Sequence, residues 1–278
     1  MSALRARSSG KGVKPADRSQ AAARRLLEAH ARRERFRPLP KELAPCTEQE
    51  AYAIQDSFVA LRAKTLGGIA GYKIALATAE MQRFVGVNAP QAGAMLEFTL
   101  HRTPARVRAA DYVQLIVEFE IAVEIAEDLP VADAPFLRSR VARAVGGVMP
   151  AIELADDRGA VYAELAKHPL ELIADNGWNE GAVLGYPVHE WQNIDLAAVR
   201  GVATINGKAV GEGTGAQAMG HPLDALAWVA DHLARRGRGL LRGDVVITGS
   251  LITSKSAKEG ELVKFALQGL GEAELRVD

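Results

Sequence analysis

The chain has 278 residues, of which 48% are hydrophobic, enough for one large globular domain or two modest ones. Lys plus Arg equals Asp plus Glu at 34 each, which argues against nucleic acid or an anionic membrane as the main partner. No run approaches the ~20 apolar residues that span a membrane. The single cysteine, Cys46, excludes an internal disulfide, favours a reducing compartment and is predicted to be a buried thiol. We therefore expect a cytoplasmic protein.

The amino-terminal segment is basic and polar. Residues 1–40 contain eleven Lys or Arg against three acidic residues, and the Ser-Ser-Gly-Lys-Gly stretch has no periodic pattern. We expect residues 1–18 to form a disordered basic tail. From Ser19 to Arg35 the alanine-rich spacing predicts an amphipathic helix.

An amino-terminal helical and α/β region is predicted over residues 19–105. Thr47-Glu48-Gln49-Glu50 has the form of a capping box and predicts a second helix from Thr47 to Lys64. After Gly67-Gly68, a short strand is expected at 69–76 and a small helix at 79–84.

The remaining part, residues 106–278, is predicted to be rich in strands. One long helix interrupts it, starting at Pro222 after His221 and stopping at Gly237. Strands are expected at 114–126, 146–154, 201–206, 244–249, 262–267 and 272–277. Helices followed by strands indicate an α+β fold and not the alternation of a doubly wound sheet.

The most informative run is 114–125, in which every odd position from 115 onward is apolar. The odd face can be buried, and Glu118 and Glu120 share the other face, about 6.5 Å apart at the strand rise. Two adjacent carboxylates can bind one hard cation if a third acidic ligand joins them. A half-solvated strand with glutamates on its wet face is the simpler interpretation of this run alone.

An ordered set of segments in residues 45–278 resembles a known family. The set comprises Gly71-Tyr72-Lys73-Ile74, Gly86-Val87, Val117 to Ala122, Ala151-Ile152-Glu153-Leu154, Ala174-Asp175-Asn176, Gly220 to Trp228, and Gly243 to Leu251. It is similar to the 2-oxopent-4-enoate (2-hydroxypentadienoate) hydratase and 4-oxalocrotonate decarboxylase branch of the fumarylacetoacetate hydrolase superfamily.

The resemblance implies a mixed β-roll body that binds Mg²⁺ or Mn²⁺ through Glu118, Glu120 and Glu153. Ligation by oxygen alone suits such a hard ion. A 2-oxo acid, the small-molecule substrate, would complete the coordination, and the ion would act as a Lewis acid. Family members often form homo-oligomers, so we expect one here.

Other site residues follow from the same resemblance. Lys73 stands at the position of a cationic or proton-transferring group near the bound acid. Gly249 and Ser250 follow a strand in a turn whose N–H groups and hydroxyl can hold a carboxylate. Asp175 could orient a lysine or a water molecule, or could simply form an Asx turn.

The chain departs from the family pattern at several positions. Gln91 occupies the place of an acidic residue, and glutamine can position water but cannot act as a general base. Glu180 or Lys73 could take over that role. Asn179 and Lys255 replace small or apolar residues and are expected to meet a polar or anionic substrate tail, although a surface-loop lysine is equally compatible with Lys255.

The expected activity is a metal-dependent hydratase, a lyase acting on a 2-oxo or 2-hydroxy-dienoic acid, as in meta-cleavage aromatic catabolism. A 4-oxalocrotonate-type decarboxylase is an alternative because it would use the same electron sink. An acylpyruvate or fumarylacetoacetate-type C–C hydrolase ranks lower, because no His–Glu pair for water activation is identified. The loss of an acid at Gln91 also leaves open a catalytically weak keto-acid-binding protein.

Overall fold

The computed structural model describes residues 15–278, so the predicted disordered tail lies largely outside the described residues. The first helix begins at Pro15, four residues before its predicted start. The helices are α1 (Pro15–Ala31), α2 (Glu48–Leu66), α3 (Ala79–Val85), α4 (Arg138–Ala144), α5 (Pro169–Ala174) and α6 (Pro222–Arg235), and the short 3₁₀ turns include η4 (Tyr162–Lys167) and η5 (Asn176–Trp178).

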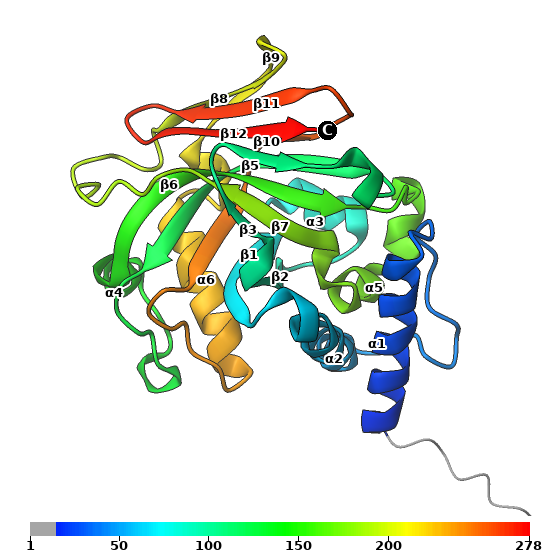
Figure 1. Cartoon of the computed structure of the whole chain (residues 1–278). Helices are drawn as coiled ribbons and strands as arrows, with labels where there is room; N and C mark the ends of the chain where they lie inside the picture. Colours follow the sequence, from blue (N-terminus) through cyan, green and yellow to red (C-terminus); the bar gives the residue numbers. More distant parts are fainter. Residues whose placement is uncertain (1–14) are drawn as a thin grey trace, which may run out of the picture.

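The strands form two sheets, shown in Figure 1. The larger has seven strands in the order β2-β1-β10-β5-β6-β7-β3 and curls strongly. Its members are β1 (Ile69–Ala75), β2 (Gln91–Leu96), β3 (Leu100–Arg102), β5 (Leu115–Ile125), β6 (Val145–Asp156), β7 (Asn179–Leu184) and β10 (Val245–Ser256). The smaller sheet has the order β4-β12-β11-β8-β9, with β4 (Ala105–Val107), β8 (Arg200–Ile205), β9 (Lys208–Thr214), β11 (Leu262–Leu267) and β12 (Gly271–Val277).

The predicted α+β architecture is confirmed, but the two predicted regions share one sheet. β1 pairs in parallel with β10, at Tyr72 opposite Val246, and in antiparallel fashion with β2. The expected boundary near residue 105 therefore falls within a continuous hydrogen-bonded structure. The pairing between β1 and β10 is what places Lys73 in the same sheet as the glutamates.

Strands β2, β3, β4, β7 and β9 were not predicted from the sequence. β2 and β9 are rich in glycine and alanine, which have low strand propensity, so tertiary pairing decides their conformation. The strand expected at 244–249 continues to Ser256 through register shifts relative to β5, so Thr248-Gly249-Ser250 lies within a strand and not in a turn after it.

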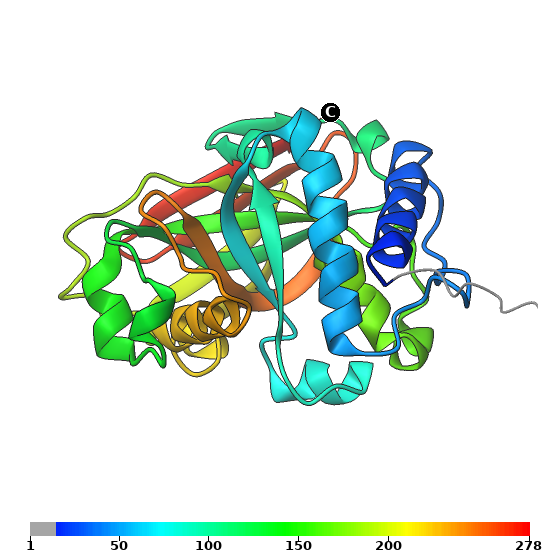
Figure 2. The same cartoon turned by 90° about the horizontal axis from the view of Figure 1, so that it is seen from below.

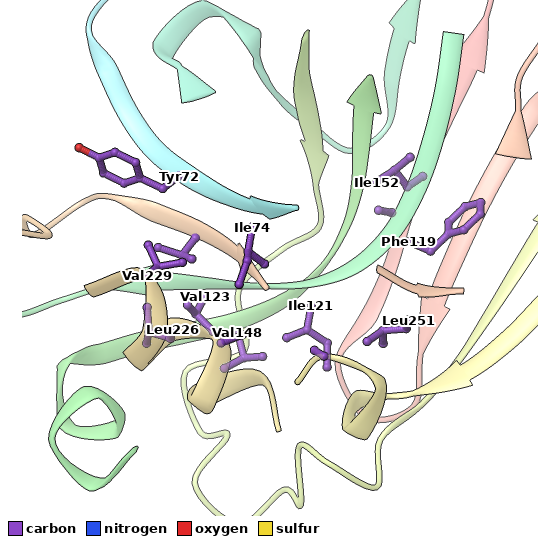
Figure 3. Packing of buried hydrophobic residues seen from close by; sticks show 14 of the residues in the cluster. Tyr72, Ile74, Phe119, Ile121, Val123, Val148, Ile152, Leu226, Val229 and Leu251 are labelled. Atoms are coloured by element: carbon purple, nitrogen blue, oxygen red, sulfur yellow. The ribbon is translucent and has the colours of Figure 1, made fainter. Parts of the chain in front are cut away.

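The apolar face of the curled sheet forms the main core. Phe119 of β5 and Phe265 of β11 are fully buried with ring centroids 5.4 Å apart, which joins the two sheets. Leu226 and Val229 of α6 belong to the same cluster, and Figure 3 shows them beside Val123. The alternation in β5 therefore places the odd residues in the core as predicted.

Helix α2 lies beside the first strands, β1 and β2, and α1 packs on the other side of α2, as Figure 2 shows. Thr47 caps α2 by accepting a hydrogen bond from the Glu50 N–H at 3.1 Å, which confirms the predicted helix start. The capping box is incomplete, because the Glu50 side chain accepts from the Cys46 N–H and not from the Thr47 N–H. Gln55 of α2 is buried and donates to the carbonyls of Ala92 and Ile173, both at 2.9 Å. These bonds tie α2 to β2 and to α5.

No helix within residues 15–278 combines the length and apolarity needed to cross a bilayer.

The single cysteine, Cys46, is exposed, which corrects the prediction of a buried thiol. It precedes the α2 cap, where its N–H donates to Glu50 at 2.8 Å, so the segment is held by its backbone and not by side-chain burial.

Replacement of Phe265 by alanine should destabilise the fold by about 3–5 kcal/mol, because a fully buried ring is lost where the two sheets meet. The measurement is the free energy of unfolding from urea denaturation. Phe98 is 63% exposed, and Phe98→Ala is the matched control with an expected change within about 0.5 kcal/mol. Equal effects of the two substitutions would contradict the proposed packing between the sheets.

Candidate metal and keto-acid site

Three glutamates converge on the inner face of the curled sheet. Glu118 of β5 lies directly opposite Glu153 of β6 in the strand register, and Glu120 follows two residues later on the same face of β5. Carboxylate oxygens of all three lie within 4.8 Å of one another. Like charges directly opposite in a sheet destabilise it, so this arrangement calls for a compensating cation.

The glutamate-bearing face is more deeply buried than the alternation of the sequence suggested. Glu120 and Glu153 are fully buried and Glu118 is half-buried. Strands whose two faces are both covered bury polar side chains only where partners or ions satisfy them. The interpretation of a half-solvated strand with wet glutamates is therefore incorrect for Glu120.

Each fully buried glutamate has one oxygen fixed by the protein and the other without a hydrogen-bond partner among residues 15–278. Glu120 Oε2 accepts from the Gly249 N–H at 2.7 Å, and Oε1 is unpaired. Glu153 Oε1 accepts from Asn179 Nδ2 at 2.9 Å and contacts Lys73 Nζ at 3.1 Å, and Oε2 is unpaired. Fixed carboxylates with unused oxygens are what a preorganised cation site requires.

Lys73 reaches the cluster from β1, which is separated from β6 by β10 and β5. On a flat sheet that separation would be about 14 Å, at roughly 4.8 Å per strand. The curl and the long side chains reduce the distance between Lys73 Nζ and Glu153 Oε1 to 3.1 Å. Lys73 is buried, and its Nζ also donates to the Gly177 carbonyl at 3.4 Å.

The electrostatics of the cluster are unfavourable for three anions alone. Burial raises the pKa of Glu118 to about 7, and the Glu153 carboxylate adds to the rise while Lys73 opposes it. Burial, together with the Glu153 and Glu118 carboxylates, raises the pKa of Glu120 well above its ordinary value, while Lys73 and the Gly249 N–H oppose the rise. Burial by itself would lower the pKa of Lys73, but the three carboxylates outweigh it and raise that pKa. Lys73 is thus an ammonium group.

These residues fit a hard divalent cation. Three carboxylates and one ammonium leave a formal charge of −2, and the donors are all oxygen. Two of these oxygens have no hydrogen-bond partner in the part of the chain that the structure describes. A bound cation would favour the ionised carboxylates and offset their repulsion. Glu118, Glu120 and Glu153 are the residues that would hold it.

Gly249 and Ser250 form hydrogen bonds with other residues of the protein. The Gly249 N–H donates to Glu120, and Ser250 Oγ donates to the Ile252 carbonyl at 2.7 Å while accepting from the Phe119 N–H. Gly249 has φ +104°, and a Cβ there would lie 2.7 Å from Ala77 Cβ, so glycine is required. The Gly249 N–H thus binds the carboxylate of Glu120, whereas the sequence predicted that it binds a carboxylate of the substrate.

Asn179 and Glu180 differ from expectation because of a β-bulge. In the β6–β7 register Glu153 pairs with Ala182 and Leu154 with Gly181, but Ala155 pairs with Asn179. The shift skips Glu180 and points Asn179 toward Glu153. Glu180 instead accepts from Arg62 Nη1 at 3.1 Å and lies 3.1 Å from His30 Nδ1, so this pairing disfavours a proton-transfer role.

Asp175 is buried and does not contact Lys73. It forms ion pairs with Arg158 and with His30 Nε2, the latter at 2.7 Å. Burial alone would raise the pKa of Asp175, but His30 and Arg158 outweigh it and lower that pKa. Asp175 is thus part of a buried ion-pair network.

Gln91 lies on the same face as Lys73. It is two residues from Gly93, which pairs with Lys73, and successive side chains alternate along a strand. Its Nε2 donates to the Pro169 carbonyl at 3.4 Å, and its buried Oε1 has no partner within the described part of the chain. That oxygen is available to accept a hydrogen bond from water or substrate.

Lys255 is not brought to the cluster by its register. It lies opposite Val117, whose side chain belongs to the apolar core on the other face of β5 from Glu118. Residues directly opposite in an antiparallel pair project to the same face. This placement disfavours Lys255 as a residue that reads the substrate tail.

Three functional candidates were missed from the sequence: His30, Arg62 and Arg158, which surround Asp175 and Glu180. The sequence predicts no role for any of the three. His30 and its partner Asp175 are 145 residues apart in the sequence, and no local pattern links residues so far apart. Only the fold could identify these ion pairs. The structure thus contains a His–Glu pair, His30–Glu180, although both side chains are engaged in a salt-bridge network.

Comparison with known proteins places this geometry in a family. The model for the fumarylacetoacetate (FAA) hydrolase C-terminal domain matches residues 75–278. A 2-keto-4-pentenoate hydratase of Paraburkholderia phymatum is 31% identical over 92% of this chain and 95% of its own, and one from Burkholderia vietnamiensis is 32% identical over 90% and 93%. The chain belongs to the fumarylacetoacetate hydrolase family.

A solved structure shares the fold closely. The 4-oxalocrotonate decarboxylase from Pseudomonas putida G7, complexed with magnesium and adipate, superposes with a TM-score of 0.85 at 24% identity, covering 94% of this chain and 98% of that one. The expected β-roll body of this family is thereby confirmed.

Replacement of Glu118 by glutamine should weaken Mg²⁺ binding at least tenfold, because one charged ligand becomes a neutral amide. Isothermal calorimetry on the metal-free chain is the measurement. In the absence of metal the same substitution should leave the melting temperature unchanged or raise it, because the opposition of Glu118 and Glu153 is relieved. Glu124 lies on the same strand and is similarly half-buried, so Glu124→Gln is the control and should bind normally. Unchanged Mg²⁺ affinity in Glu118→Gln would remove Glu118 from the ligand set.

Proposed function

We propose that the protein is a divalent-metal-dependent hydratase that adds water to a 2-oxo or 2-hydroxy-dienoic acid, as in the catabolism of aromatic compounds. The observation that carries the proposal is the pair of fully buried oxygens on Glu120 and Glu153 that have no hydrogen-bond partner among residues 15–278, beside a buried ammonium. Two relatives named as 2-keto-4-pentenoate hydratases, each at least 31% identical over at least 90% of the chain, support hydration in particular.

Glu118, Glu120 and Glu153 would hold Mg²⁺ or Mn²⁺. When bound, the ion supplies a Lewis acid for the 2-oxo acid. Lys73 Nζ, which carries its proton, can stabilise negative charge that develops on a substrate oxygen and can donate a proton to it. Gln91 Oε1 can accept a hydrogen bond from the water that is added, although it cannot remove a proton.

Asn179 and Gly249 act on the ligands and not on the substrate. By donating to Glu153 and Glu120 they fix the orientation of both carboxylates. The Gly249 N–H also opposes the rise in the pKa of Glu120. This division leaves Lys73 and Gln91 as the two side chains from β1 and β2 that can face the reacting carbon skeleton.

Decarboxylation is the second candidate, favoured by the close fold similarity to the magnesium-bound 4-oxalocrotonate decarboxylase. Both reactions use the same stabilisation of charge at the 2-oxo group, so the cluster alone does not separate them. C–C hydrolysis is less supported because Glu180 and His30 are paired with Arg62 and Asp175. Assembly into a homo-oligomer is also proposed, as expected for the family.

The reaction should be decided by comparing substrates side by side. Turnover of 2-hydroxypenta-2,4-dienoate, 4-oxalocrotonate and an acylpyruvate would be measured with Mg²⁺ and after EDTA. Hydratase activity predicts that the dienoate has the highest kcat/KM and that EDTA abolishes turnover. CO₂ release from 4-oxalocrotonate at a higher kcat/KM would assign the decarboxylase instead, and metal-independent turnover would contradict the role of the glutamates.

Lys73→Met should lower kcat by at least a hundredfold, because the stem remains but the charge and the proton of Nζ are lost. Mg²⁺ binding should be retained, since removal of a positive charge beside Glu153 does not weaken attraction for a cation. Kinetics and calorimetry on one preparation separate the two effects. Wild-type turnover in this variant would exclude Lys73 from catalysis.

A further inference from the structure

We infer that His30, in the last turn of α1, is a positioning residue that fixes the 175–180 turn and thereby sets the contacts of Lys73 and Glu153. The inference rests on the proposed function for its kinetic consequence only. The 175–180 turn is the segment from Asp175 to Glu180 that links α5 to β7. His30 is the one side chain of α1 for which the structure records contacts with both ends of this turn.

The geometry of His30 is bidentate. Its Nε2 lies 2.7 Å from Asp175 Oδ1 and its Nδ1 lies 3.1 Å from Glu180 Oε1. Nε2 is hydrogen-bonded to Asp175, and Nδ1 forms an ion pair with Glu180, so two carboxylates face the ring and favour the imidazolium. Burial lowers the pKa of His30, but Asp175 and Glu180 outweigh it and raise the pKa to about 9.

The backbone between these two anchors is in an uncommon conformation. Asn176, Gly177 and Trp178 all have positive φ, at 54°, 58° and 60°. A bulky residue such as tryptophan rarely adopts this region, and the strain persists only where the surroundings hold the residue in place. The turn therefore depends on external contacts to keep its shape.

The same turn supplies two contacts to the candidate site. The Gly177 carbonyl accepts from Lys73 Nζ at 3.4 Å, and Asn179 Nδ2 donates to Glu153 Oε1 at 2.9 Å. Gly93 of β2 allows this approach, because a Cβ there would lie 2.8 Å from the Asn176 carbonyl oxygen and 3.1 Å from Lys73 Cγ. A shift of the turn would thus move an ammonium and a carboxylate together.

Other side chains contact the same two carboxylates or pack against the His30 ring. Arg158 pairs with Asp175, and Arg62 of α2 pairs with Glu180 and also donates to the Asn179 carbonyl at 3.3 Å. The Phe58 ring lies 5.1 Å from the imidazole. Each carboxylate has its own arginine, so His30 is the group that couples the two ends to each other and to α1.

The inference is tested with His30→Gln, which cannot place a positive charge between Asp175 and Glu180. Mg²⁺ affinity is measured by calorimetry on the purified full chain, and kcat and KM are measured with 2-hydroxypenta-2,4-dienoate at a temperature at which the variant is folded. We expect Mg²⁺ affinity and kcat each to fall about tenfold, as is typical when a group that orients a metal ligand is lost. KM should change less than kcat.

Arg18→Met is the matched control. Arg18 lies at the other end of α1, where it donates to the Glu42 carbonyl at 3.0 Å and pairs with Glu50 at 3.5 Å. This variant should lower the melting temperature but leave Mg²⁺ affinity and kcat within about twofold of the wild type. If the two variants lose affinity equally, α1 contributes stability only and the inference fails.

Glu180→Gln provides a second route if His30→Gln does not fold, because it keeps the size of the side chain and removes one of the two anchors. Reduced Mg²⁺ affinity supports the inference, and wild-type affinity together with wild-type kcat in a folded variant overturns it. The Mg²⁺ measurement needs no substrate. A wild type that binds Mg²⁺ but turns over none of the substrates would therefore refute the proposed function while the role of His30 is still decided.

Discussion

The repulsion between Glu118 and Glu153, directly opposite each other on β5 and β6, is the constraint on which the rest of the structure depends. Two carboxylates in this position destabilise a sheet, and burial makes the cost larger. The protein reduces that cost with Lys73 from β1 and Asn179 from β7, and leaves a net charge that suits a divalent cation. The mutual repulsion of these carboxylates and their capacity to bind a metal ion have the same origin.

The curl of the large sheet makes this arrangement possible. Its apolar face packs on the small sheet through Phe119 and Phe265 and on α6 through residues such as Leu226, so the backbone is rigid where the charges are held. The side chains on the opposite, concave face then converge, and Lys73 reaches Glu153 across two intervening strands. The hydrophobic core and the charged site are two faces of the same strands, so packing determines how closely the charges approach.

The 175–180 turn connects the charged site to the amino-terminal helices. Its left-handed backbone is unfavourable in isolation, and it is held by buried ion pairs from α1, α2 and the loop after β6. A buried ion pair is weak evidence for net stability, because desolvation offsets most of the attraction. Its contribution here is better understood as geometric, since it fixes which backbone carbonyl and which amide face Lys73 and Glu153.

The sequence alone determined the class of fold, the capped start of α2, the alternation of β5 and the three glutamates, because each depends on short-range periodicity or on an ordered set of motifs. Tertiary structure decided the rest. The Gly249 N–H is directed at Glu120 by a register shift in β10, Asn179 replaces Glu180 beside Glu153 through a bulge, and His30 meets partners about 145 residues away. Register shifts and long-range ion pairs arise from how strands and helices meet in space, and a local pattern carries no information about either.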